Sequence, residues 1–136
     1  MDVLADCTKT ATNARIVLEE KRSKIVFINN KGVKINVVQV DGCAIKEGIR
    51  CDYLLINDVS TEHYIELKGS DIDHAVSQIE RTIKLLSADK QREKYCFIIS
   101  SRSPLLTTKI QLLKLRFRKQ YGATLVVKNR QYEHVL

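Results

Sequence analysis

The chain has 136 residues, of which 44% are hydrophobic, and it contains five glycines and one proline. This length and composition fit a single domain over residues 1–136 with its own hydrophobic core, and they exclude a low-complexity or linker-like polypeptide. A net charge of +7 favours a polyanionic partner such as a nucleic acid, although many basic domains bind none.

The N-terminal region and the cysteines bear on the cellular compartment. Residues 1–22 contain no continuous hydrophobic run, so we expect neither a signal peptide nor a transmembrane helix and predict a cytoplasmic protein. The four cysteines are Cys7, Cys43, Cys51 and Cys96. They lack the C-x-x-C spacing of zinc ribbons and redox motifs, so we expect them to be reduced and mostly buried.

The first predicted elements are a helix and a β-hairpin. Apolar residues at spacings of three and four, from Leu4 to Leu18, predict a helix over residues 3–21. Two segments rich in β-branched residues, 24–28 and 33–38, flank a turn-like sequence and predict the two strands of a hairpin.

Two strands, a helix and a further strand are predicted next along the chain. Strands are predicted at about 50–57 and 62–68, and Ser70 or Asp71 then offers an N-cap for a helix over 71–88. The nearly continuous apolar run at 94–100 is typical of a buried central strand.

A last helix and strand complete the predicted order. The helix ends at Tyr121 because Gly122 takes the C′ position, and residues 124–128 form the strand. The order is therefore α-β-β-β-(β)-α-β-α-β. Strands joined through helices run parallel and hairpin strands run antiparallel, so the predicted fold class is α/β, with a mixed sheet flanked by helices.

Three residues on two neighbouring strands carry the candidate chemistry. A hairpin of this length brings Asp52 beside Glu66, and Glu66 and Lys68 point to the same face because they are two residues apart on a strand. Two carboxylates and an ammonium group at one spot are what a Mg²⁺-assisted phosphodiester hydrolase needs. The structural alternative is a solvated strand face that carries an ion pair.

The element order and these three residues resemble the PD-(D/E)XK superfamily of restriction-endonuclease-like proteins over most of the chain. The resemblance implies an α-β-β-β-α-β core, followed here by an extra helix and strand, with Mg²⁺ held at the strand ends. Asp52 and Glu66 would be the metal ligands and Lys68 the catalytic lysine, and Mn²⁺ would substitute for Mg²⁺. Cys51 stands where the family pattern has a proline.

The resemblance also points to residues on two helices. Some relatives add an acid from the first helix to the metal site, and Glu19 is the better candidate there than Glu20, with Glu47 as a further alternative. Gln78 resembles a glutamine that reaches the active site in the exonuclease-like branch. His74, in the same helix, is a candidate for contact with a phosphate, although a surface or capping histidine is commoner.

Basic residues on the last predicted helix form a candidate nucleic-acid surface. We expect them to contact the phosphate backbone without reading sequence, the alternative being an ordinary solvated basic face. They are Lys109, Lys114, Arg116, Arg118 and Lys119.

The prediction for function is a Mg²⁺-dependent nuclease that hydrolyses phosphodiester bonds through metal-activated water, with DNA favoured over RNA. A homodimer is expected because one small domain offers little surface for enclosing a duplex. Two alternatives stay open: a catalytically silent module of the same fold that binds nucleic acid or a protein, and an interaction protein in which the acid pair is accidental.

Overall fold

The computed structural model describes residues 3–57, 61–67, 71–87, 89, 91–101 and 107–136. Its elements, in chain order, are α1 (Val3–Asp6), β1 (Thr8–Ala11), β2 (Arg15–Glu20), β3 (Ser23–Ile28), β4 (Ile35–Gln39), β5 (Tyr53–Ile56), β6 (Glu62–Leu67), α2 (Ile72–Leu86), β7 (Lys94–Ser100), α3 (Thr107–Tyr121), β8 (Ala123–Asn129) and β9 (Gln131–Val135).

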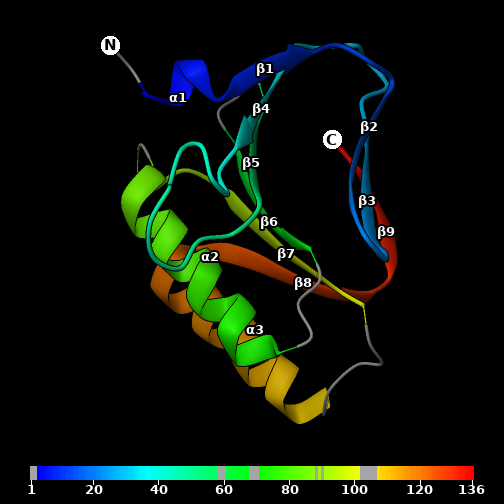
Figure 1. Ribbon diagram of the computed structural model, residues 1–136. Coiled ribbons are helices and arrows are strands. Elements are labelled where there is room, and N and C mark those ends of the chain that lie inside the picture. The colour runs from blue at the N-terminus through cyan, green and yellow to red at the C-terminus, as the bar shows by residue number, and fades with distance from the viewer. Residues whose placement is uncertain (1–2, 58–60, 68–70, 88, 90, 102–106) are drawn as a thin grey trace.

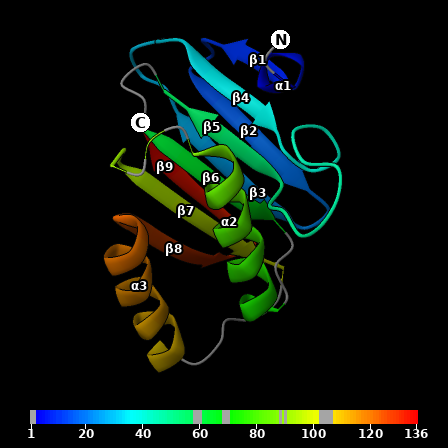
Figure 2. The same ribbon diagram turned by 90° about the vertical axis from the view of Figure 1, so that its left-hand side faces the viewer.

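Three layers make up the molecule. A six-stranded mixed sheet in the order β1-β4-β5-β6-β7-β8 forms the middle layer, and a three-stranded sheet in the order β2-β3-β9 forms an outer one. The helices α2 and α3 cover one face of the six-stranded sheet, and the three-stranded sheet covers the other (Figures 1 and 2). The fold is therefore α/β with a mixed sheet, as the sequence predicts.

From β5 to β8 the elements follow the predicted order, whereas β9 is an additional strand that is not predicted from the sequence. β5 and β6 pair antiparallel, whereas β6 with β7 and β7 with β8 pair parallel, each crossover passing through a helix. Asp71 caps α2, because its side chain accepts hydrogen bonds from the backbone N–H groups of Asp73 and His74. Gly122 follows α3 at a φ of 61°, the left-handed conformation that favours glycine at this position.

A hydrophobic core lies on each face of the six-stranded sheet. One lies between the helices and the six-stranded sheet and includes Tyr64, Ile79 and Phe117. The other lies between the two sheets and includes Phe27 and Phe97. The alternating side chains of β6 serve both cores: Tyr64 faces the helices, and the residues on either side of it in the strand face the second sheet.

The predicted helix over residues 3–21 is wrong. Only α1 is helical, and the rest forms β1 and β2. In β2 the buried residues Ile16 and Leu18 alternate with the exposed residues Arg15, Val17 and Glu19, which is the period of a strand packed on one face. The same apolar residues fit the spacing of a helix as well as that of a strand, so the pairing of β2 with β3 decides the conformation.

The predicted hairpin of residues 24–28 with 33–38 is also wrong. β3 pairs with β2 and β9 in the three-stranded sheet, whereas β4 pairs with β1 and β5 in the other sheet. The turn between β3 and β4 carries the chain from one layer to the next, stabilised by reciprocal hydrogen bonds between the Asn29 side chain and the backbone of Val33.

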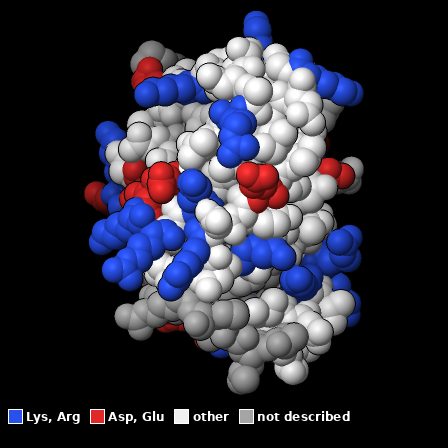
Figure 3. Space-filling model, turned by 90° about the vertical axis from the view of Figure 1, so that its right-hand side faces the viewer, with Lys and Arg blue, Asp and Glu red and all other residues white. Residues whose placement is uncertain are grey.

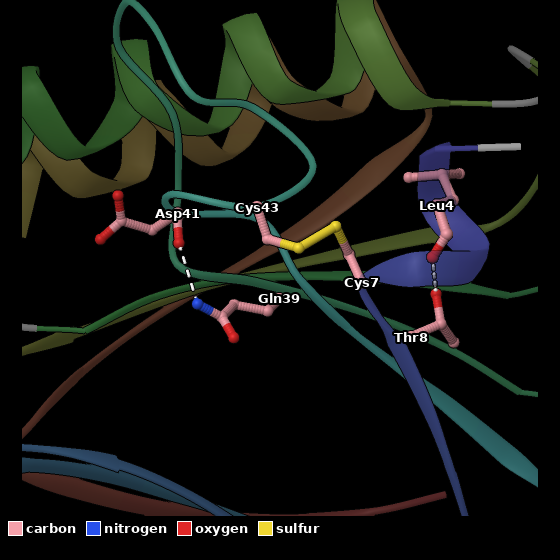
Figure 4. Close-up of a disulfide and its surroundings, with 6 residues drawn as sticks. All are labelled: Leu4, Cys7, Thr8, Gln39, Asp41 and Cys43. Atoms are coloured by element: carbon pink, nitrogen blue, oxygen red, sulfur yellow. Dashed lines mark hydrogen bonds between the residues drawn. A yellow bond between two sulfur atoms is a disulfide. The ribbon is translucent and has the colours of Figure 1, made fainter.

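The cysteine prediction holds for two of the four residues. Cys51 and Cys96 are free and buried. Cys7 and Cys43, which the sequence predicts to be reduced, instead form a disulfide with their Cα atoms 5.8 Å apart. It ties the start of β1 to the segment between β4 and β5 (Figure 4).

Candidate active site

The hairpin of β5 and β6 brings the two predicted metal ligands together. Tyr53 pairs with Ile65, so one more step of the antiparallel register sets Asp52 opposite Glu66. The Asp52 backbone N–H donates to the Ile65 carbonyl at 3.0 Å, and Asp52 Oδ2 accepts from the Leu67 N–H at 2.7 Å. Both side chains are buried, with Asp52 8% and Glu66 6% exposed. Lys68 lies outside the described residues.

Two further acids join this pair. Burial raises the pKa of Asp52, and the charges of Glu20 and Asp41 and a hydrogen bond with the Glu20 carboxyl group raise it further, against the lowering effect of the Leu67 N–H. Burial likewise raises the pKa of Glu66, assisted by the charges of Asp52, Glu20 and Asp41. Four carboxyl groups, one from β2, one from β6 and two from the segment between β4 and β5, therefore interact through their charges.

Glu66 carries the clearest sign of an incomplete environment. Its Oε1 atom is buried, and no described residue donates a hydrogen bond to it. The Gln78 side chain, from α2, hydrogen-bonds to Glu66 and lowers its pKa, but burial and the neighbouring charges outweigh that contribution. A buried carboxylate oxygen without a donor is costly unless it is protonated or meets a cation.

A pocket of about 230 Å³ opens beside the pair. It is lined by Asp41, Gly48, Ile49, Arg50, Asp52, His74 and Gln78. The lining combines acids with two basic side chains, Arg50 and His74. Arg50 forms an ion pair with Asp41 at 2.9 Å, and His74 is exposed on the first turn of α2.

The segment between β4 and β5 forms one wall of this pocket and is fastened on two sides. From α2, the Arg81 guanidinium donates to the carbonyls of Glu47 and Ile49, at 3.0 and 2.7 Å, and Gln78 Nε2 donates to the Arg50 carbonyl at 3.0 Å. On the other side, the disulfide holds Cys43 to Cys7, which immediately precedes β1. Figure 4 shows Cys43 close to Asp41, whose carbonyl accepts a hydrogen bond from Gln39.

Magnesium fits part of this donor set. Mg²⁺ in proteins is commonly held by one or two carboxylates and keeps several waters, and Asp52 and Glu66 supply two hard oxygen ligands. Among the described residues, no group of three or more histidine, cysteine, aspartate or glutamate side chains is arranged to hold a metal ion. The arrangement is thus a two-carboxylate site whose neighbours Glu20 and Asp41 act through charge.

The other predicted acids lie elsewhere. Glu19 is on β2, not on a helix, and it is exposed opposite Lys24 in β3. Its neighbour Glu20 points the other way, in phase with the buried Leu18, and this places it at Asp52. Glu47 is exposed on the pocket wall and contributes its carbonyl to Arg81.

The predicted helix over residues 3–21 favours Glu19 over Glu20, and Asp41 is not among the candidates that the sequence indicates. A strand reading of β2 would have placed Glu20 on the buried face with Ile16 and Leu18, so the signal was present but was read with the wrong period. Asp41 had no comparable signal, because its position depends on the backbone hydrogen bond between its N–H and the Asp52 carbonyl at 3.3 Å.

The basic residues of α3 do not form one surface. Lys109 pairs with Asp73 at 2.6 Å and Arg116 with Glu80 at 2.7 Å, so these two face α2. Lys114 and Arg118 instead line a groove beside β8. Lys119 is exposed near the end of the helix.

No helix among the described residues is both long and apolar enough to span a membrane. A search of family models, curated proteins and solved structures finds no significant match to this chain.

Proposed function

We propose that this protein is a Mg²⁺-dependent nuclease that hydrolyses phosphodiester bonds, with DNA as its substrate in preference to RNA. One observation carries the proposal. Asp52 and Glu66 are buried side by side, and Asp52 lines an open pocket. Burial and the charges of their acidic neighbours raise the pKa values of both carboxyl groups. A divalent cation at this pair would replace the protons and relieve the repulsion.

The order of elements supports a restriction-endonuclease-like core. β4, β5 and β6 form an antiparallel series that is followed by α2 and by β7 parallel to β6, which matches the β-β-β-α-β part of the implied core. The helix that the resemblance puts first is absent from the described residues at that place, where β1, β2 and β3 stand instead. The proposal therefore concerns the part of the core that holds Asp52 and Glu66.

The residues of the pocket divide the chemistry between them. Asp52 and Glu66 would hold Mg²⁺, or Mn²⁺ in its place, and the bound metal would lower the pKa of a water molecule and neutralise charge on the phosphoryl oxygens. Gln78 orients Glu66 through their hydrogen bond. Arg50, which lines the pocket, would contact the phosphate group. Lys68, assigned from the sequence alone, would stabilise the developing negative charge.

Cleavage assays test this function directly. Labelled plasmid, linear duplex, single-stranded and four-way-junction DNA are incubated with Mg²⁺ or Mn²⁺. We expect metal-dependent cutting by the wild type, no cutting by Asp52→Asn or Glu66→Gln, and a rate lower by about 100-fold or more for Lys68→Ala. Glu19→Gln removes an exposed carboxylate one residue from the cluster and should cut at the wild-type rate.

A catalytically silent binding module is the second candidate, and the lack of a three-ligand group among the described residues favours it. Thermal unfolding with and without Mg²⁺ separates the two. A nuclease requires that Mg²⁺ raise the unfolding temperature of the wild type but not of Asp52→Asn. The silent module requires that it raise neither. A nuclease acting on duplex DNA would further be a homodimer, which sedimentation analysis measures.

A further inference from the structure

A groove along the outer edge of β8 lies away from the acid pair. β8 is the last strand of the six-stranded sheet, so one of its edges pairs with no other strand among the described residues. The groove along it has a volume of about 280 Å³ and is lined by Lys114, Arg118, Ala123, Thr124, Leu125, Val126, Val127, Lys128 and Tyr132. The six consecutive residues of β8 in this lining show that the groove follows the strand.

The cations of the groove come from both faces of the sheet. Ala123 and Leu125 belong to the core under the helices, so Lys114 and Arg118 of α3 reach the groove from that face. Val126 packs on the core between the two sheets, and Lys128, two residues further along the strand, points to the same face as Val126. Lysine and arginine side chains thus border the β8 edge from two directions.

Two contacts hold these cations at the groove. Arg118 Nη2 donates to the Thr124 hydroxyl at 3.5 Å, and Lys128 Nζ lies 5.4 Å from the centroid of the Tyr132 ring. Lys114, Arg118 and Lys128 are all exposed. Among the described residues that line the groove, every charged side chain is positive, in contrast to the acid pocket.

A second pocket continues the row of basic side chains beyond the β8 groove. Tyr132 also lines a pocket of about 420 Å³ with Arg15, Lys24, Val26, Gln131 and Glu133, on the three-stranded sheet. Among the described contacts of the two cations in this pocket, one is an ion pair, between Arg15 and Glu133 at 3.5 Å. Figure 3 shows lysine and arginine side chains spread over much of this side of the molecule, with acidic side chains between them in a few places.

We infer that the β8-edge groove binds a single nucleic-acid strand by its phosphodiester backbone. A phosphodiester chain suits the groove because cations border it from both faces of the sheet, and a concave basic groove of this kind follows one strand. A duplex presents its phosphates on a convex surface and would reach only the rim. The inference goes beyond the proposed cleavage, because binding here needs neither Mg²⁺ nor the acid pair.

Binding in EDTA tests the inference apart from catalysis. Fluorescence anisotropy is measured with a labelled DNA strand of about 12 nucleotides, with its duplex, and with the strand in competition with a polyglutamate peptide. The groove variant is Lys114→Ala/Arg118→Ala/Lys128→Ala. The control variant, Lys9→Ala/Lys31→Ala/Lys34→Ala, removes the same charge from exposed lysines on or near β1 and β4, at the opposite edge of the sheet. Thermal unfolding verifies that both are folded.

We expect the groove variant to lose about tenfold or more in affinity for the single strand and the control variant less than about threefold. The slope of log K against log salt should fall by about 2 in the groove variant, because three phosphate contacts on a single strand contribute about 0.7 each. Glu66→Gln should bind like the wild type even if it cannot cut.

Several results would overturn the inference. Equal losses in the two triple variants would mean that net charge alone attracts DNA. Tighter binding of the duplex through the same three residues would assign the groove to double-stranded nucleic acid, and displacement of the strand by polyglutamate at equal charge concentration would make it a site for acidic protein. Absence of measurable wild-type binding would dismiss it, whatever the cleavage assays show.

Discussion

The register of β5 and β6 buries the side chains of Glu66 and Asp52 next to each other, where the ionised form of a carboxyl group is unfavourable. Carboxyl groups ionise near pH 4 in an unfolded chain. In the folded protein, burial and the charges of neighbouring acids raise the pKa of Asp52 to about 7 and that of Glu66 to about 9. The folded protein therefore retains protons that the unfolded chain has already released. This difference links stability to pH.

The part of the free energy of unfolding that comes from these two carboxyl groups should fall as the pH rises. The contribution of the two protonated carboxyl groups is fully present below the unfolded pKa near 4 and is lost as the pH rises through the folded pKa values. Between about pH 5 and pH 9, Glu66→Gln should flatten this decline by about 1 to 3 kcal/mol in urea unfolding. Mg²⁺ should raise the wild-type unfolding temperature more at the alkaline end, because it competes with protons.

An exposed neighbour provides the control for this pH dependence. Glu19→Gln changes the same functional group on a solvated strand face and should leave the decline as it is in the wild type. If Glu66→Gln has the same pH dependence as Glu19→Gln, the two buried carboxyl groups do not hold the protons assigned to them.

The position of a side chain could be predicted where the spacing of nearby apolar residues fits only one kind of secondary structure. Asp52 and Glu66 could be paired in advance because the β5–β6 hairpin is short and both flanks are apolar. Glu20 could be placed only by giving β2 the period of a strand, and Asp41 could not be placed, because its position depends on a contact with Asp52 in a different segment. The placement of a side chain by long-range pairing leaves no signature in its immediate neighbours.

At the scale of elements, β2 shows why a pattern of apolar residues can be read in two ways. Its sequence fits a stripe with helical spacing, yet only the alternation of Ile16 and Leu18 with exposed residues describes the observed burial. Tertiary pairing with β3 overrides the helical reading. α2 and α3 were predictable because their patterns run for four turns with a cap or a glycine at one end.

The segment between β4 and β5 owes part of its position to the disulfide. Cross-linking Cys7 to Cys43, 36 residues apart, restricts the unfolded chain and should stabilise the protein by about 3 to 4 kcal/mol. Reduction should therefore lower the unfolding temperature and, because this segment walls the acid pocket, also weaken Mg²⁺ binding. Thermal unfolding and Mg²⁺ titration, each with and without dithiothreitol, measure both effects.

The double variant Cys7→Ser/Cys43→Ser supplies the reference for this experiment. It should behave like the reduced wild type and should not respond to dithiothreitol. Loss of stability on reduction without any loss of Mg²⁺ affinity would show that the contacts from Arg81 and Gln78 alone position the pocket wall.

At the scale of the whole molecule, the second sheet creates an interior that the sequence did not reveal. His63 is 1% exposed between the two sheets, where its ring stacks on Tyr95 at 5.4 Å and meets Phe27 edge-on. Its Nδ1 lies 3.0 Å from the Leu55 carbonyl, which can only accept, so Nδ1 carries the proton. Burial lowers the pKa of this imidazole to about 4.

Acid should therefore weaken the contact between the sheets. His63 ionises near pH 6.5 in the unfolded chain, so its contribution to stability is present above that value and is lost as the pH falls toward 4. In urea unfolding over this interval, His63→Phe should reduce the loss of stability by about 2 kcal/mol. The control His74→Gln changes an exposed histidine and should show the wild-type loss.

The two-sheet architecture could be predicted only in part. The parallel order of β6, β7 and β8 follows from strands separated by helices, and it was predicted correctly. β9 was missed because a five-residue strand with alternate exposed side chains carries little signal. Without β9, nothing in the sequence indicates that β3 belongs to a separate sheet.

The parallel pairing of β3 with β9 also sets the order of events during synthesis. Lys24 pairs with Gln131 and Ile28 with Val135, so the second sheet receives its last strand 107 residues later in synthesis than β3. At ordinary elongation rates β3 waits on the order of 10 s with one edge unpaired. During that interval the nascent chain exposes a strand edge beside apolar side chains, which is the kind of surface that chaperones recognise and that misassembles with a neighbouring copy on the same messenger RNA.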